Sequence, residues 1–226
     1  MKRFLALLAA LTLPLTALAQ PVRHFQDGYF TSSEDPAIRI RIAPEFTYVG
    51  SISFILFDRA DVERYVWVKA PKGRVEAMVV FQFEGLRDGV EGRYAFSIPE
   101  GNRFSSADHR FSPERIEMGG LRWVHNTWAF DNARNASENP DAESARTLAM
   151  LEDAGYGLPD ELIMSRYVTE VGQESRKELI LFYMEPISAS GHTLADFGSG
   201  PEIGAEFDAL SDQVVRRGEG AFRVQD

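Results

Sequence analysis

The chain has 226 residues, of which 44% are hydrophobic, 26% charged and 12% aromatic. These proportions are those of a compact globular protein and exclude a collagenous, low-complexity or wholly disordered chain. With 24 basic and 34 acidic side chains the formal charge is -10, which argues against nucleic acid or an anionic membrane surface as a partner. The absence of cysteine excludes disulfides and thiolate nucleophiles.

The N-terminus has the three parts of a secretory signal peptide. Two basic residues precede an apolar run over 4–18, and the small-x-small pattern of a cleavage site ends at Ala19. We therefore expect residues 1–19 to be removed and residues 20–226 to form one periplasmic or secreted bacterial domain. The run is too short to span a bilayer, and no later stretch is long enough, so we expect no stable membrane insertion after cleavage.

Most of the remaining chain is rich in β-branched and aromatic residues separated by turn residues, which predicts strands. The predicted strands are 52–57, 62–68, 75–83, 93–98, 121–130, 162–171 and 179–184. The segment 75–83 is apolar on both faces, which indicates a central strand. The polar stretch 172–177 predicts a hairpin loop, and 221–224 predicts a short strand at a sheet edge. We expect long surface loops over 99–118 and 186–200.

Two segments contain the residues that typically begin and end helices. The first is predicted to begin with Asn139 as its N-cap and to stop at Gly155. The second is predicted over 201–217, with a glycine after it as the stop signal. Its single apolar stripe consists of Ile203, Phe207, Leu210 and Val214. A helix with one apolar stripe lies across a surface, and we expect that surface to be a face of the sheet.

Strands joined mainly by hairpins, with helices late in the order, predict an α+β fold. We expect a largely antiparallel sheet of about six to eight strands covered by two helices. The sequence leaves open whether the sheet is open or curled into a half-barrel.

Motifs for common chemistries are missing. No G-x-S-x-G elbow, glycine-rich phosphate loop or dinucleotide fingerprint occurs. None of the four histidines has a histidine four residues away, so we predict no metal and no cofactor. Glu84 and Glu185 both end apolar strands; they either meet across a groove as paired carboxylates or simply close those strands at the solvent edge.

The segment 121–130 alternates aromatic side chains with groups that can donate or accept a hydrogen bond. That mixture is typical of a small-molecule pocket, and it also fits a core strand whose His125 satisfies a neighbour's backbone. The following strands carry residues of the same mixed character. The candidate ligand-binding residues are therefore Trp123, His125, Arg166, Tyr167 and Tyr183. No residue is singled out as catalytic.

Three kinds of function follow. The first is an exported soluble binding or accessory protein that holds a small apolar or amphipathic ligand, or a protein partner, against an aromatic-lined sheet face. The alternative is an exported hydrolase that uses loop carboxylates and His125. An interaction module without a pocket is the third, and would show a large exposed apolar patch. Converging titratable groups around His125 would favour the hydrolase.

Overall fold

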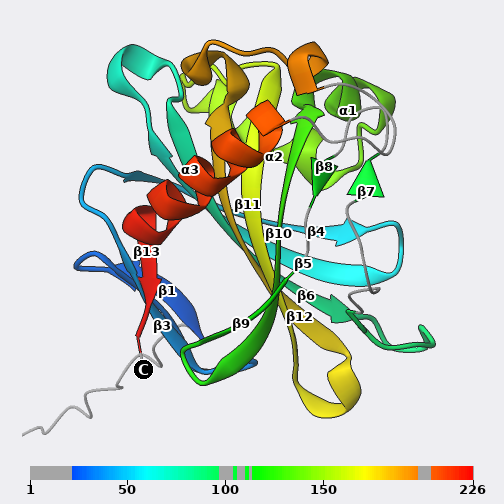
Figure 1. Cartoon of the computed structure of the whole chain (residues 1–226). Helices are drawn as coiled ribbons and strands as arrows, with labels where there is room; N and C mark the ends of the chain where they lie inside the picture. The colour runs from blue at the N-terminus through cyan, green and yellow to red at the C-terminus, as the bar shows by residue number, and fades with distance from the viewer. Residues whose placement is uncertain (1–21, 97–103, 106–109, 112–113, 198–204, 226) are drawn as a thin grey trace, which may run out of the picture.

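The computed structural model describes residues 22–96, 104–105, 110–111, 114–197 and 205–225. The expected signal peptide lies outside these residues. The described chain forms three layers (Figure 1). A large sheet lies in the middle, a small sheet and one long helix cover one of its faces, and two shorter helices cover the other. The expected α+β fold on an antiparallel sheet is confirmed.

The large sheet has seven strands, and every neighbouring pair is antiparallel. In spatial order they are β4 (Thr47–Leu56), β5 (Ala60–Lys69), β6 (Ala77–Leu86), β12 (Lys177–Pro186), β11 (Glu161–Val171), β10 (Leu121–Asp131) and β9 (Glu114–Met118). The sheet is not closed, because the edge strands β4 and β9 do not pair with each other.

Both faces of the central strands are buried, so each strand carries two sets of core residues. On β12, Leu181 and Tyr183 belong to the core on one face, while Phe182 and Met184 belong to the core on the other. This follows from the alternation of side chains along a strand. We call the first the α3 face and the second the α1/α2 face.

The α3 face is covered by the small sheet and by helix α3 (Ala205–Ala221). The small sheet consists of β1 (Arg23–Gln26), β2 (Tyr29–Ser32), β3 (Ile38–Ile42) and β13 (Phe222–Val224). Phe30 in β2 is fully buried and makes edge contacts with the rings of Trp67 and Phe81. Along α3 the predicted stripe is confirmed for its described members, Phe207, Leu210 and Val214, which are all buried; Ile203 lies outside the described residues.

The α1/α2 face is covered by helices α1 (Asn132–Glu138) and α2 (Glu143–Asp153). Asp131 caps α1 by accepting a hydrogen bond from the backbone nitrogen of Arg134 at 2.8 Å. Helix α2 buries Thr147 and Leu151. A layer of side chains from β5, β6, β10, β11 and β12 lies below these helices.

One predicted strand is wrong. The described part of 93–98 is not a strand, because its backbone bonds to a hairpin loop and to side chains instead of a neighbouring strand. Tyr94 donates to the carbonyl of Ser175, and Phe96 donates to the Glu170 carboxylate. The expected loop over 99–118 contains β9 and, in its described parts, the short strands β7 (Phe104–Ser105) and β8 (Arg110–Phe111).

The helix boundaries also differ from the prediction. Helix α2 begins at Glu143 and not after Asn139, which instead ends α1, a helix that the sequence reasoning missed. Helix α3 continues through Gly218 to Ala221. A Cβ at Gly218 would lie only 3.1 Å from the side chain of Tyr183, so glycine serves the close approach of helix and sheet and is not a stop signal.

The small strands β1 to β3 were also missed, and β13 returns to the small sheet and not to the large one. The expected hairpin between β11 and β12 is confirmed, with a short 3-10 turn η2 (Gln173–Ser175) at its tip. The stretch after β12 forms 3-10 turns η3 (Ile187–Ser190) and η4 (Leu194–Phe197).

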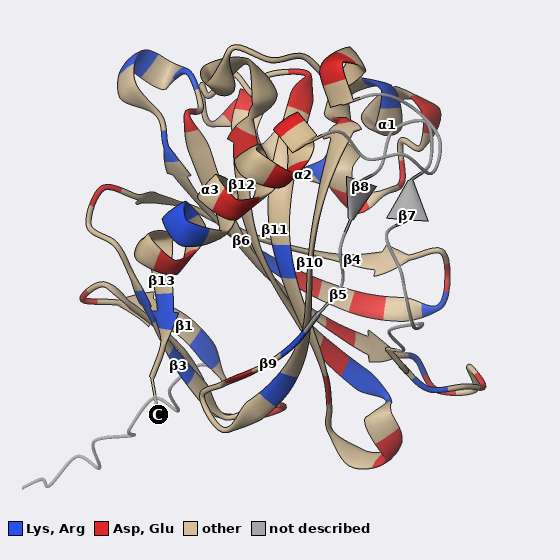
Figure 2. Ribbon diagram, viewed as in Figure 1, with Lys and Arg blue, Asp and Glu red and all other residues tan. Residues whose placement is uncertain are grey.

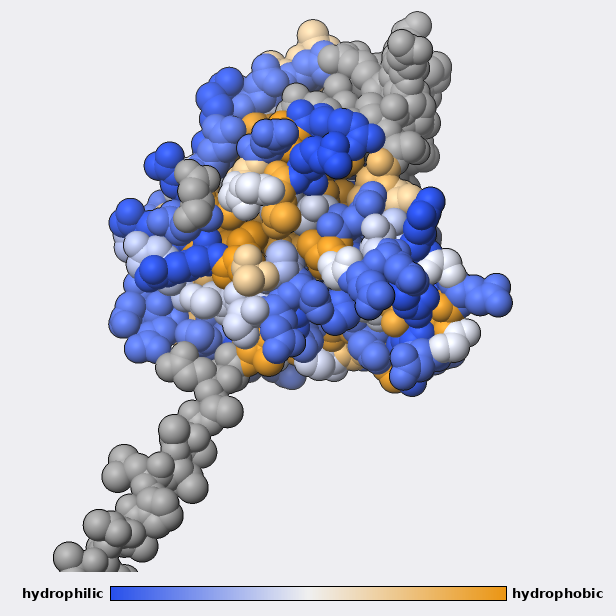
Figure 3. Space-filling view, turned by 90° about the horizontal axis from the view of Figure 1, so that it is seen from below, coloured by the Kyte–Doolittle hydropathy of each residue, from blue (hydrophilic) through white to orange (hydrophobic). Residues whose placement is uncertain are grey.

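Charged residues cover much of the outside of the molecule, and some also lie within the strands of the large sheet (Figure 2). Seen from below, hydrophilic surface surrounds scattered apolar residues near the middle (Figure 3). No helix in the described part of the chain is long and apolar enough to cross a membrane.

Candidate functional site

The α1/α2 face has a band of polar side chains in an otherwise apolar layer. Its six members are all buried or half-buried: Arg64, Gln82, Glu84, Asn126, Arg166 and Glu178. The strand register brings them together. Arg64 lies opposite Gln82 on the neighbouring strand, and Glu84 lies opposite Glu178. Asn126 lies opposite Arg166 at the other end of the band.

A cavity of 570 Å³ lies over this band. Its polar lining includes Arg64, Glu84, Arg166 and Glu178 from the sheet, with Glu143 from α2. Its apolar lining includes Phe57, Trp128, Phe130, Met164, Phe182 and Met184. We call this space the polar cavity. Its size lies within the range of about 300–1,000 Å³ that is usual for small-molecule pockets.

The two guanidinium groups of the polar cavity have no salt-bridge or hydrogen-bond partner among the described residues. Arg64 is 5% exposed, and its Nε is buried without a partner. Its guanidinium lies 5.5 Å from the ring centroid of Phe182, and that of Arg166 lies 5.8 Å from the ring centroid of Trp128. Burial lowers the pKa of Arg64 to about 10 and also lowers the pKa of Arg166. Both stay positively charged at neutral pH.

Glu84 and Glu178 form a carboxyl pair. They lie opposite each other on neighbouring strands, and Glu84 accepts hydrogen bonds from Gln82 and Tyr94. Burial raises the pKa of Glu84, and burial together with the negative charge of Glu84 raises the pKa of Glu178 to about 8. Glu178 is therefore mainly protonated at neutral pH. The Oε2 atom of Glu178 is buried without a partner among the described residues.

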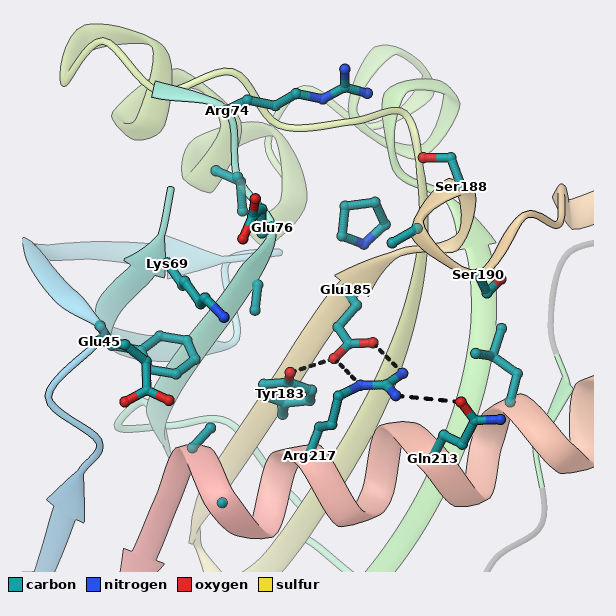
Figure 4. A pocket seen from close by; sticks show the side chains of 18 residues that line it. Glu45, Lys69, Arg74, Glu76, Tyr183, Glu185, Ser188, Ser190, Gln213 and Arg217 are labelled. Carbon is teal, nitrogen blue, oxygen red and sulfur yellow. Dashed lines mark hydrogen bonds and ion pairs between the residues drawn. The ribbon is translucent and has the colours of Figure 1, made fainter. Parts of the chain in front are cut away.

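The α3 face has a second hollow of 770 Å³ beside helix α3, which we call the α3 groove (Figure 4). At its floor Glu185 accepts two hydrogen bonds from Arg217, at 2.6 and 2.7 Å. The hydroxyl of Tyr183 donates to the same carboxylate. Burial and this carboxylate raise the pKa of Tyr183 above its ordinary range. The buried polar groups of the α3 groove are thus bonded to one another.

The five candidate residues from the sequence do not meet in one place. Trp123, His125, Tyr167 and Tyr183 lie on the α3 face, where each is at least 96% buried. Arg166 lies on the other face and lines the polar cavity. Of the four on the α3 face, Tyr183 lines the α3 groove.

His125 and Trp123 make the contacts of core residues. The His125 Nε2 atom lies 2.9 Å from the hydroxyl oxygen of Ser165, and its ring stacks on Tyr167 with 4.4 Å between centroids. Trp123 donates from Nε1 to the carbonyl of Met118 at 2.9 Å. These bonds hold the rings within the core of the α3 face.

A groove shared by Glu84 and Glu185 does not occur. Glu84 faces α1 and α2, whereas Glu185 is bonded to α3 on the other side of the sheet. The partner of Glu84 is Glu178, which sequence reasoning missed together with Arg64 and Glu143. Arg64 had a signal, since it interrupts the valine face of the strand 62–68.

Among the described residues no three His, Asp or Glu side chains are grouped so that they could hold a metal ion. No protein-family model, curated protein or solved structure matches the chain. Any functional conclusion therefore depends on the geometry of the polar cavity.

Proposed function

We propose that the protein is an exported binding protein that holds a small amphipathic ligand with an acidic head group in the polar cavity. The observation that carries the proposal is the pair of guanidinium groups, Arg64 and Arg166, which line one cavity without a direct anionic partner among the described residues. Export is inferred from the pattern of the N-terminus.

Buried charges in proteins are nearly always paired, because removing an ion from water is costly. A guanidinium group that faces a cavity can be paired by a ligand instead of a side chain. The planar guanidinium binds carboxylates and phosphates through two parallel hydrogen bonds. An acidic head group between Arg64 and Arg166 would supply the missing partner for both.

The rest of the cavity suits the apolar part of such a ligand. Trp128, Phe130 and Phe182 supply aromatic surface, and Met164 and Met184 supply side chains that adapt to irregular shapes. The polar cavity thus combines apolar surface, which contributes affinity, with polar groups, which orient a ligand.

The position of Phe57 indicates that a ligand enters the polar cavity at the tip of the hairpin between β4 and β5. It lines the cavity and is 63% exposed, with a backbone φ of 49°. A bulky residue rarely adopts this left-handed conformation, and such strain gathers at functional sites. An exposed, strained phenylalanine at the cavity is hard to explain by folding and is well placed to contact an apolar ligand.

We prefer binding to hydrolysis because the parts of the expected hydrolase are separated. His125 lies on the α3 face, and the carboxyl groups of the polar cavity lie on the opposite face of the sheet. A mechanism that combines His125 with these carboxylates has no geometric basis.

Tryptophan fluorescence provides the test. Trp67 and Trp123 are 0% and 1% exposed, whereas Trp128 lines the cavity. We expect 3-phenylpropionate and octanoate to change the fluorescence saturably, and the Trp128→Phe variant to lose the change. The neutral amides of the same acids should bind about tenfold more weakly or worse, because they lack the charge-assisted hydrogen bonds.

The matched variants are Arg64→Gln and Arg122→Gln. Arg122 is an exposed arginine on β10, outside the polar cavity. Arg64→Gln should weaken binding of the acids to the level of the amides, and Arg122→Gln should leave it unchanged. Absence of saturable binding by any acid, or equal binding of acids and amides, would overturn the proposed function.

A further inference from the structure

We propose that the ligand of the polar cavity is a zwitterion, an apolar amino acid or a short apolar peptide. Its ammonium group would lie against Glu143 and Glu178, and its carboxylate against Arg64 and Arg166. This inference rests on the proposed function and deepens it, because it names the chemical class of the ligand.

Glu143 offers a carboxylate without a cation. It is the first residue of α2 and lines the polar cavity. The one hydrogen bond of its carboxylate among the described residues is a long one of 3.4 Å from Gln82. No lysine, arginine or histidine of the described chain lies within ion-pair distance of it. Its oxygens are therefore available to a donor inside the cavity.

Glu178 offers a second acceptor. Glu84 accepts hydrogen bonds from Gln82 and Tyr94, whereas the Oε2 atom of Glu178 has no partner among the described residues. A buried acceptor without a donor is unfavourable, so a ligand that donates to it gains that contact. An ammonium group has three donors, enough for Glu143 and Glu178 together.

The charges of the cavity argue for a ligand that carries both signs. The polar cavity is lined by three carboxyl groups, those of Glu84, Glu143 and Glu178, and the last is mainly protonated at neutral pH. Arg64 and Arg166 contribute two positive charges. A purely anionic or purely cationic ligand pairs with groups of one sign only, whereas a zwitterion offers a partner to groups of both signs and adds no net charge. Uncompensated buried charge is costly, which favours the zwitterion.

Three ligands with the same phenyl skeleton separate the contributions of the two charges. They are L-phenylalanine, 3-phenylpropionate, which lacks the amine, and 2-phenylethylamine, which lacks the carboxylate. By titration calorimetry at pH 7 we expect L-phenylalanine to bind at least about tenfold more tightly than either of the others, since each lost charged contact removes a charge-assisted hydrogen bond. L-phenylalanyl-L-phenylalanine is the fourth ligand, and distinguishes a peptide from a free amino acid.

The variant Glu143→Gln tests whether the higher affinity for L-phenylalanine comes from its ammonium group. It should lower the affinity for L-phenylalanine to that of 3-phenylpropionate and leave the affinity for 3-phenylpropionate unchanged. Glu152→Gln, an exposed glutamate of the same helix, is the control and should change neither.

The outcomes separate the two proposals. If 3-phenylpropionate binds as tightly as L-phenylalanine and the dipeptide, the zwitterion is refuted while an acidic ligand stands. If Glu143→Gln weakens the zwitterion and the acid equally, Glu143 supports the fold and does not contact the amine. If neither acids nor zwitterions bind, the proposed function itself is wrong, and this inference falls with it.

Discussion

The buried polar groups on the two faces of the large sheet differ in whether they have hydrogen-bond partners. On the α3 face the polar groups are bonded to one another: Glu185 to Arg217 and Tyr183, and Thr127 to Ser211. On the α1/α2 face, polar atoms of Arg64, Gln82, Asn126 and Glu178 are buried without partners among the described residues. On the α3 face the exceptions include the indole nitrogen of Trp67 and the Nε atom of Arg23, whose guanidinium lies over the ring of Phe83.

This difference suits a structural role for the polar groups of the α3 face and a binding role for those of the α1/α2 face. Paired polar groups satisfy the fold and can be removed only at a cost in stability. Unpaired polar groups around a cavity are a liability for the fold unless something binds there. Substitutions on the α3 face should therefore act on stability, and substitutions on the α1/α2 face should act mainly on binding.

The largest effect is expected on the α3 face, at Phe207. This side chain is 1% exposed and packs between α3 and the sheet, with its ring against Phe197. Phe207→Ala should lower the free energy of unfolding by about 3–5 kcal/mol, because it leaves a cavity in a packed core. Urea denaturation measures the loss. A loss below about 1 kcal/mol would mean that the helix does not depend on this stripe.

The next largest effect concerns the pH dependence of stability through Glu178. The pKa of this carboxyl is about 8 in the folded protein and near the ordinary 4.5 when unfolded. Because the folded pKa is the higher, the stability that Glu178 contributes is complete below pH 4.5 and is lost as pH rises through 8. Glu178→Gln stays uncharged, so its free energy of unfolding relative to the native chain should rise by about 2–4 kcal/mol from pH 5 to pH 9.

Denaturation at several pH values measures this difference. Glu152→Gln is the control, because Glu152 is an exposed residue of α2 outside the polar cavity. Its difference from the native chain should stay constant with pH. A constant difference for Glu178→Gln as well would show that this carboxyl is ionised at neutral pH, and the charge balance of the polar cavity would have to be revised.

Two arginines give the most direct comparison of the faces. Arg217→Met should destabilise the protein by about 1–3 kcal/mol, because Glu185 is buried and loses two of its hydrogen bonds. Arg64→Met removes a buried cation that has no direct partner among the described residues, so stability should be unchanged or raised by up to about 2 kcal/mol. Urea denaturation at pH 7 compares them. An equal loss in both variants would show that Arg64 supports the fold as Arg217 does.

The sequence predicted those parts of the fold that depend on local pattern. The strand 62–68 and the stripe of Phe207, Leu210 and Val214 were predicted because their periodicity reports burial directly. The segment around Tyr94 alternates in the same way, but its backbone bonds to a hairpin loop, which no local pattern reveals. The strand Ile38–Ile42 alternates clearly, but its five residues form a pattern too short to predict a strand with certainty from sequence.

The site was harder to predict because it depends on strand register. Glu84 and Glu178 are far apart in sequence and meet only through the pairing of β6 with β12. Sequence reasoning paired Glu84 with Glu185, which the alternation along β12 places on the opposite face. Arg166 was selected for its mixed surroundings, but its neighbour Tyr167 necessarily faces the other way.

The smallest effect on stability is expected at Phe57, where one substitution should change stability and binding in opposite directions. Phe57 and Asp58 form the turn of the β4–β5 hairpin with φ values of 49° and 57°. Asparagine tolerates this conformation better than phenylalanine, so Phe57→Asn should raise the free energy of unfolding by up to about 1 kcal/mol. The same change removes an apolar side chain from the polar cavity, so the affinity for 3-phenylpropionate should fall several-fold.

Urea denaturation and the fluorescence titration measure the two effects on one variant. A gain in stability with a loss of binding is what a strained functional residue predicts. If the variant is less stable and binds as before, Phe57 serves the fold, and the entrance of the cavity lies elsewhere.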